Sequence, residues 1–137
     1  MYGDAATHWS LKWLGKPFVA EEYDCLDFVQ EVLRVDRQKE IRIPPRRRGT
    51  TVRIMASGIA QLGGEVAVPR RGPVEEFDAV LMKPTGTRIT GYHIGLAALV
   101  DGVWHVLHCV ETLGAVLYPA STIHHHGWEI EGYYRWV

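Results

Sequence analysis

The sequence predicts an α+β fold in which helices near the N-terminus pack on an antiparallel sheet. Apolar residues recur at helical spacing in the first half of the chain, whereas the second half consists of short apolar segments typical of strands. Helices that precede a run of closely connected strands are typical of an α+β domain. With 137 residues and 47% hydrophobic content, the chain is expected to form a single domain, residues 1–137.

Two helices are expected in the first quarter of the chain. Residues 5–14 carry apolar side chains near helical spacing, and the Gly-Lys-Pro sequence at 15–17 supplies a stop. Asp24 can cap a second helix, and Asp27 in its first turn favours the positive end of the helix dipole. The broad apolar face of this helix is formed by Leu26, Phe28, Val29, Val32 and Leu33. Cys25 therefore lies in the first turn.

The rest of the chain is expected to contain one more helix and then strands. Residues 36–49 are polar and interrupted by two prolines, which predicts a loop. A third helix is expected from Thr50 or Thr51 to the two glycines at 63–64. The expected strands are residues 66–68, 77–82, 93–100, 103–110, 115–118 and 133–137, with a helical turn within 121–128.

A hairpin between the two longest predicted strands brings two histidines together. With Asp101-Gly102 as a two-residue turn, the predicted pairs are Val100 with Val103, Ala98 with His105, Gly95 with His108 and His93 with Val110. His93 and His108 then share a face as diagonal neighbours, so one imidazole can orient the other, while His105 and Cys109 point to the opposite face. A three-residue loop would instead place His105 beside His93.

Cys25 is the candidate nucleophile. The oriented N–H groups and the positive dipole end of a helix N-terminus stabilise a thiolate, and they could also hold the oxyanion of acyl transfer. A neutral imidazole within reach could take the thiol proton. The alternative is that Cys25 is a small buried hydrophobic residue and that the histidines are strand residues satisfied by polar neighbours. Tyr23 and Asp24, directly before Cys25, are candidate substrate-binding residues, although a tyrosine at this position can also simply pack.

In their order along the chain, five segments resemble the NlpC/P60 cysteine peptidases, in particular the short single-domain forms of tailed phages and prophages. These segments are Trp13-Leu14-Gly15-Lys16-Pro17-Phe18, Tyr23-Asp24-Cys25, Phe77-Asp78-Ala79-Val80-Leu81, His93-Ile94-Gly95-Leu96 and Val106-Leu107-His108-Cys109. The resemblance implies a papain-like core with Cys25 as nucleophile, His93 as base and His108 as the orienting third residue. It also implies hydrolysis of amide bonds in peptidoglycan stem peptides. The chain departs from the family at Leu26-Asp27, where Ser-Gly is common.

Composition and charge indicate which other classes of partner this chain is expected to bind. The formal net charge of −1 gives no general attraction to nucleic acid or to an anionic membrane, and Arg46-Arg47-Arg48 is expected to be a solvated loop that could contact phosphate or carboxylate. Consecutive side chains diverge, so His124-His125-His126 is not expected to hold a metal, and no cofactor is expected. The N-terminus lacks the pattern of a signal peptide, which predicts synthesis in the cytoplasm. Action at the cell wall from a virion tail would then need another delivery route.

Two further functions remain open at this point. The chain could be a structural tail-assembly protein that keeps a papain-like fold while catalysis is secondary or lost. It could also carry out acyl transfer or thioester chemistry on a substrate other than peptidoglycan, since fold does not determine substrate. The scissile bond, the oligomeric state and the choice of His108 or His105 as third residue are left undecided.

Overall fold

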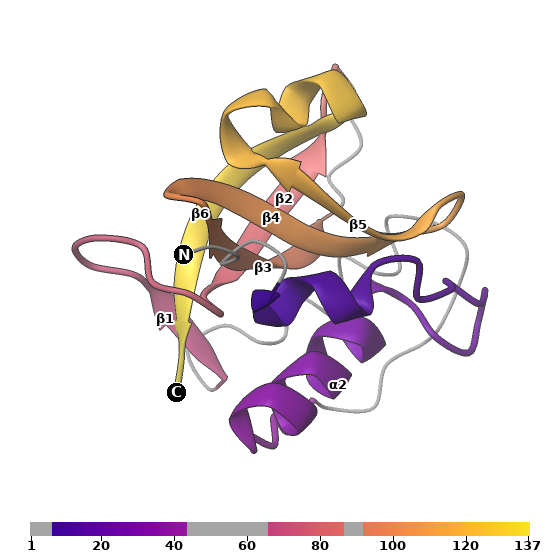
Figure 1. Ribbon diagram of the computed structural model, residues 1–137, viewed down its shortest axis with the longest axis horizontal. Helices are drawn as coiled ribbons and strands as arrows, with labels where there is room; N and C mark the ends of the chain where they lie inside the picture. The colour runs from indigo at the N-terminus through magenta and orange to yellow at the C-terminus, as the bar shows by residue number, and fades with distance from the viewer. Residues whose placement is uncertain (1–6, 44–65, 87–91) are drawn as a thin grey trace.

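The computed structural model describes residues 7–43, 66–86 and 92–137. Within these ranges six strands form one antiparallel sheet in the order β1-β6-β2-β3-β4-β5, and the predicted α+β class is confirmed (Figure 1). The elements are η1 (Trp9–Trp13), α2 (Cys25–Arg37), β1 (Ala67–Pro69), β2 (Ala79–Pro84), β3 (His93–Val100), β4 (Val103–Val110), β5 (Gly114–Pro119), η2 (Ala120–His126) and β6 (Trp128–Trp136).

Of the predicted segment 5–14, residues 5 and 6 lie outside the described residues, and Trp9–Trp13 form a 3-10 helix. His8 caps this helix by accepting a hydrogen bond from the Ser10 amide at 3.1 Å. The helix ends because the chain turns into a ladder with β5: the Gly15 amide donates to Ala115 O and the Ala115 amide to Lys16 O, both at 2.9 Å. The helix therefore ends where the Gly-Lys-Pro sequence predicted a stop, with Leu14 as its C-cap.

Helix α2 agrees with its prediction. The Asp24 side chain accepts hydrogen bonds from the amides of Leu26 and Asp27, at 3.0 and 3.2 Å, and the Asp27 side chain accepts one from the Asp24 amide at 2.9 Å. This reciprocal arrangement is a capping box, and it starts the helix at Cys25. The helix ends at Gln38, whose left-handed backbone (φ 49°) allows its amide to bond Leu33 O. The predicted third helix lies outside the described residues.

The strands follow the prediction most closely at the hairpin. Strands β3 and β4 have the predicted bounds, and their register pairs Val100 with Val103 and Ala98 with His105. Both turn residues have positive φ, 52° at Asp101 and 75° at Gly102, as a two-residue type I′ turn requires. The predicted register is therefore confirmed, and the three-residue loop is excluded.

Strands β2 and β6 differ from the prediction. Strand β2 starts at Ala79 rather than at Phe77, because Phe77 has a φ of 71° that no strand residue can adopt. Strand β6 is longer than the predicted 133–137 and begins at Trp128. The β2–β6 register shifts between Leu81 and Met82, and this irregularity breaks the simple alternation by which a strand is recognised in sequence.

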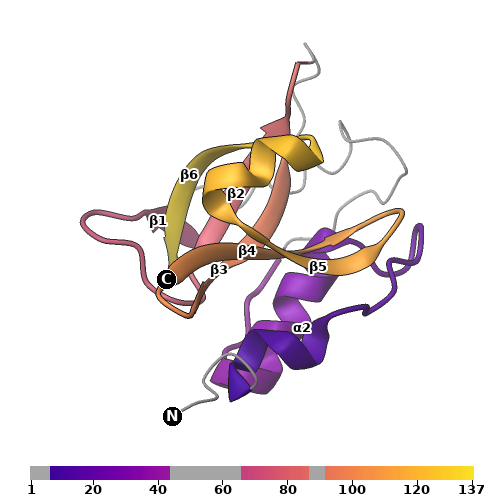
Figure 2. The same ribbon diagram turned by 45° about the horizontal axis from the view of Figure 1, so that its top comes forward.

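Helix α2 and η2 lie on opposite sides of the sheet (Figures 1 and 2). The apolar face of α2 packs in one cluster with the alternate strand residues Ala79, Ile94, Leu96, Leu107, Cys109 and Ala115. The intervening strand residues point the other way, and they form a second cluster with η2 through Val80, Met82, Ala97, Val106 and Ile123. We call these the α2 face and the η2 face.

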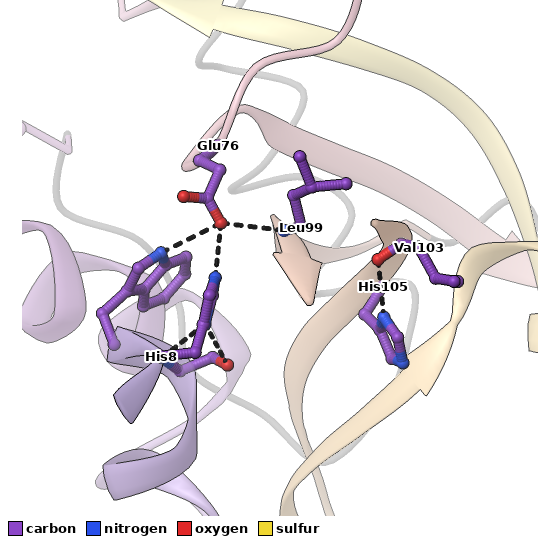
Figure 3. Close-up of polar contacts among 7 residues, drawn as sticks. His8, Glu76, Leu99, Val103 and His105 are labelled. Carbon is purple, nitrogen blue, oxygen red and sulfur yellow. Dashed lines mark hydrogen bonds and ion pairs between the residues drawn. The ribbon is translucent and has the colours of Figure 1, made fainter. Parts of the chain in front are cut away.

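A single carboxylate ties the N-terminal segment to the hairpin (Figure 3). One oxygen of Glu76 accepts hydrogen bonds from His8 Nε2 at 2.5 Å, from the Trp9 indole at 3.2 Å and from the Leu99 amide at 2.8 Å. The Trp9 ring also stacks on Phe77, with ring centroids 3.9 Å apart. Glu76 thereby connects η1, the start of β2 and the end of β3.

Replacement of Glu76 by alanine is expected to lower the free energy of unfolding by about 1–2 kcal/mol, because three donors lose a shared acceptor. Urea denaturation measures the change. Glu75→Ala is the matched control, since the neighbouring side chain is exposed and contacts Arg70 only at 3.4 Å. An equal loss in both variants would show that the Glu76 contacts do not stabilise the fold.

Candidate functional site

Cys25 is the first residue of α2 and is only 1% exposed. It packs in the cluster of the α2 face, together with the apolar residues of its own helix and with Cys109 of β4. The amides of Leu26 and Asp27 donate to the Asp24 side chain, and the Phe28 amide donates to Asp24 O at 3.0 Å. These three amides are therefore already hydrogen-bonded to Asp24. Helix α2 can still stabilise a negative charge near Cys25 through the positive end of its dipole.

His93 and His108 form a hydrogen-bonded pair, as their predicted shared face implied. His93 Nε2 lies 2.7 Å from His108 Nδ1, and the two rings meet nearly edge-on at 74°. Gly95 makes this approach possible. A Cβ atom at Gly95 would lie 2.8 Å from Leu107 O and 2.9 Å from the Cβ of His108, closer than real Cβ contacts. The glycine between the two histidines is thus required by the packing of the hairpin.

The pair is buried among aromatic rings. His93 is 3% exposed and His108 0%, and the Trp128 indole stacks on His93 at 4.2 Å with the planes 18° apart. Burial, and then the neighbouring His108, lowers the pKa of His93 well below its usual range. Burial, and then the charge of His126, lowers the pKa of His108 to about 3. Both imidazoles are therefore neutral at neutral pH, which is the form that a general base needs.

These lowered pKa values predict that the protein loses stability on acidification. The unfolded chain takes up protons below about pH 6.5, while the folded chain resists them, so the stabilisation is complete above that pH and declines as the pH falls towards 3. The expected slope is about 1.4 kcal/mol per pH unit for each histidine. Urea denaturation between pH 7 and 5 measures it.

The variants His108→Leu and His105→Ala separate this effect from general acid lability. His108→Leu removes one of the two buried groups and should reduce the slope by about half. His105 lies on the other face of β4, where its Nδ1 is 2.9 Å from Val103 O, and His105→Ala should keep the full slope. A slope unaffected by His108→Leu would contradict the assignment.

The structure brings the two histidines together on one face of the sheet. Ile94 and Cys109, the chain neighbours of His93 and His108, pack on the α2 face, so by strand alternation the two histidines point to the η2 face. Cys25 packs on the α2 face with Cys109. The sharing of a face by His93 and His108 and the placement of Cys109 on the opposite face were thus both predicted correctly.

The remaining candidate residues have defined roles in the fold. His105 hydrogen-bonds the Val103 carbonyl and does not contribute to the pair (Figure 3). Asp24 is the helix cap. The Tyr23 hydroxyl donates a hydrogen bond to Glu31, and Lys16 Nζ lies 5.2 Å from the centre of the Tyr23 ring. Burial and then the Glu31 carboxylate raise the pKa of Tyr23 above its ordinary value, so the hydroxyl stays protonated.

Metal ligation finds no support in the described part of the chain. No group of three or more histidine, cysteine or acidic side chains has a metal-binding arrangement there. The rings of His124 and His125 contact each other, with centroids 4.2 Å apart, while His126 stacks on Tyr118 at 3.5 Å. The histidine run thus divides between two environments, as diverging neighbours on a 3-10 helix must. Arg46-Arg47-Arg48 lies outside the described residues.

Trp128 is the site residue that sequence reasoning missed. Its ring covers His93 and meets His108 nearly at a right angle, 6.3 Å away. The available signal was weak: a tryptophan directly after the histidine run and a glycine, at a position where no strand was expected. Its contact with the pair depends on β6 lying beside β2, next to the His93 end of β3.

No family model and no curated protein matches this chain. Among the described helices, none is both long and apolar enough to cross a membrane.

Proposed function

We propose that this chain is a cysteine peptidase of the NlpC/P60 type that hydrolyses amide bonds in peptidoglycan stem peptides. Cys25 acts as nucleophile, His93 as base and His108 as the residue that orients the base. The observation that carries the proposal is the 2.7 Å hydrogen bond between His93 Nε2 and His108 Nδ1. It leaves Nδ1 of His93 as the nitrogen that accepts the thiol proton. The start of α2 at Cys25 and the order of the motifs along the chain support the same assignment.

The chemistry follows that of other thiol hydrolases. Neutral His93 takes the proton of the Cys25 thiol, the thiolate attacks the amide carbonyl, and the positive end of α2 stabilises the negative charge that develops. The imidazolium then returns the proton to the leaving amine, and water hydrolyses the acyl-enzyme. His108 holds the His93 ring in one orientation throughout, as the third residue of a catalytic triad does.

Catalysis by this set requires the Cys25 thiol and the His93 imidazole to come within hydrogen-bonding reach of each other. One face of the His93 ring stacks on Trp128 at 4.2 Å. The proposal therefore assigns Nδ1 of His93, and not the Trp128 side of the ring, to the contact with the thiol.

The burial of Cys25 and of the histidine pair favours a second candidate function. A tail-assembly protein that keeps the fold for docking needs neither an accessible thiol nor a mobile base. The 1% exposure of Cys25 and the aromatic packing around His93 agree with such a role. In that case a Cys25→Ala chain would support virion assembly as well as the parent chain.

Alkylation of the native protein with iodoacetamide, followed by mass spectrometry at a series of pH values, tests the proposal without knowledge of the substrate. An ordinary thiol ionises near pH 8.5, so an activated Cys25 is expected to react well below pH 7 and to react more slowly after His93→Ala. Cys109 is the internal control, because burial raises its pKa to about 12. If Cys25 reacts only after unfolding, the result would contradict the peptidase proposal and favour the structural function.

A further inference from the structure

A pocket of about 270 Å³ lies on the η2 face, at the end of the sheet where β4 turns into β5. Cys25 is not among its lining residues. The lining includes His108, Glu111, Leu113, Tyr118, His126 and Trp128. They come from β4, the turn after it, β5, η2 and β6, so the pocket exists only in the assembled fold.

The inner wall of this pocket carries an unsatisfied ring nitrogen. His108 is fully buried, and its Nδ1 is occupied by His93. Its second nitrogen, Nε2, has no hydrogen-bond partner among the described residues. A buried polar atom without a partner is costly, and native structures usually supply one. The unsatisfied Nε2 of a ring that lines the pocket therefore indicates a ligand with a hydrogen-bonding group.

The side walls of the pocket are aromatic. The rings of Tyr118 and His126 stack at 3.5 Å with their planes 1° apart, and the Trp128 ring stands perpendicular to His108 at 88°. Gly127 has a φ of 89°, which turns the chain between His126 and Trp128 so that both rings line the same space. Such walls favour a flat group that can stack.

The charge and the size of the pocket restrict the class of ligand that it can bind. The two neutral imidazoles share one N–H in their mutual hydrogen bond, so Nε2 of His108 is a donor in one tautomer and an acceptor in the other. An amide matches both, because it carries a carbonyl oxygen and an N–H. Glu111 is exposed at the rim and disfavours an anionic ligand. The volume is below that of sites for drug-sized molecules, which suits a single residue.

We propose that this pocket binds a neutral amide, either one peptide unit or a carboxamide side chain, which stacks between His126 and Trp128 and hydrogen-bonds to Nε2 of His108. Binding selects one tautomer of the His93–His108 pair, because the amide must present either its oxygen or its N–H. The site does not require Cys25 to be a nucleophile, so it holds for the enzyme and for the structural protein alike.

Titration of the ¹⁵N-labelled protein with N-acetyl-alaninamide tests the site. The expected result is a saturable shift of the His108 imidazole ¹⁵N signals and of the Trp128 indole signal, while His8 and His105 do not change. N-acetyl-alaninate has nearly the same shape but carries a negative charge near Glu111, and it should bind about fivefold more weakly or less. Cys25→Ser protein should bind the amide as the parent does, which makes this result independent of catalysis.

Two neighbouring variants provide the structural control. His126→Ala removes a stacking wall and should weaken binding about 2- to 10-fold. His124→Ala alters the same 3-10 helix outside the pocket and should leave the affinity unchanged. The absence of a saturable shift at His108, equal affinity for the acid and the amide, or equal effects of the two variants would each overturn the proposal.

Discussion

Gly95→Ala is expected to destabilise the protein by about 2–3 kcal/mol, because the added methyl group would overpack the centre of the hairpin. Its Cβ would lie 2.8 Å from the backbone oxygen of Leu107 and 2.9 Å from the Cβ of His108. Neither atom is the end of a flexible side chain, so relief requires that β3 and β4 separate. Thermal or urea unfolding, read by circular dichroism, measures the loss.

The same substitution should also disturb the histidine pair. Separation of the strands at Gly95 lengthens the 2.7 Å contact between His93 and His108, so the imidazole ¹⁵N signals of both residues should change even where the variant stays folded. Gly132→Ala is the control within the sheet, because a Cβ there meets only side-chain atoms of Tyr134, the nearest at 3.4 Å, which is ordinary van der Waals contact. Equal stability of the Gly95 and Gly132 variants would show that the hairpin can open at no cost.

Cys25→Ser is expected to reduce hydrolysis of stem-peptide substrates by about a thousandfold or more, because a hydroxyl replaces the only group proposed to attack the carbonyl. The change is nearly isosteric in a buried position, so the fold should persist. His93→Ala should cause a loss of similar size, and the double variant should lose little more, since the two residues act as a unit. Release of free amines from purified peptidoglycan measures the activity.

Control variants separate catalysis from folding in this experiment. His105→Ala removes a half-buried histidine of the same hairpin whose ring bonds the Val103 carbonyl, and it should retain full activity. Cys109→Ser changes the second buried thiol, and its activity should follow its stability alone. A fully active Cys25→Ser protein would contradict the peptidase proposal. Hydrolysis of small amides without hydrolysis of cell wall would indicate a substrate other than peptidoglycan.

The parts of the fold that were predicted correctly are those controlled by neighbours in the chain. Asp24 and Asp27 form a capping box through contacts three residues apart, and the turn at Asp101-Gly102 adopts the positive φ angles that its residue types favour. A two-residue turn determines the register of the whole hairpin. The contact between His93 and His108 followed from that register, although the residues are 15 positions apart.

The parts that were predicted less well depend on distant segments. The segment after the first helix pairs with β5 through Gly15, Lys16 and Ala115, a contact between distant residues that the local sequence does not indicate. Strand β6 was recognised only in its second half, because a register shift opposite Leu81 and Met82 interrupts its alternation. Trp128 lies in the half that was missed, and the aromatic cover of His93 was missed with it.

The sequence by itself determined that α2 begins at Cys25, that His93 and His108 share one face of the hairpin, and that the domain combines helices with an antiparallel sheet. Only the tertiary structure decided which face of the sheet α2 covers. Seven of the eight residues of β3 are buried, so its two faces are almost equally apolar and the sequence pattern does not distinguish them. The choice was made by the packing of α2 against Ile94 and Cys109 and by the packing of η2 on the opposite side of the sheet.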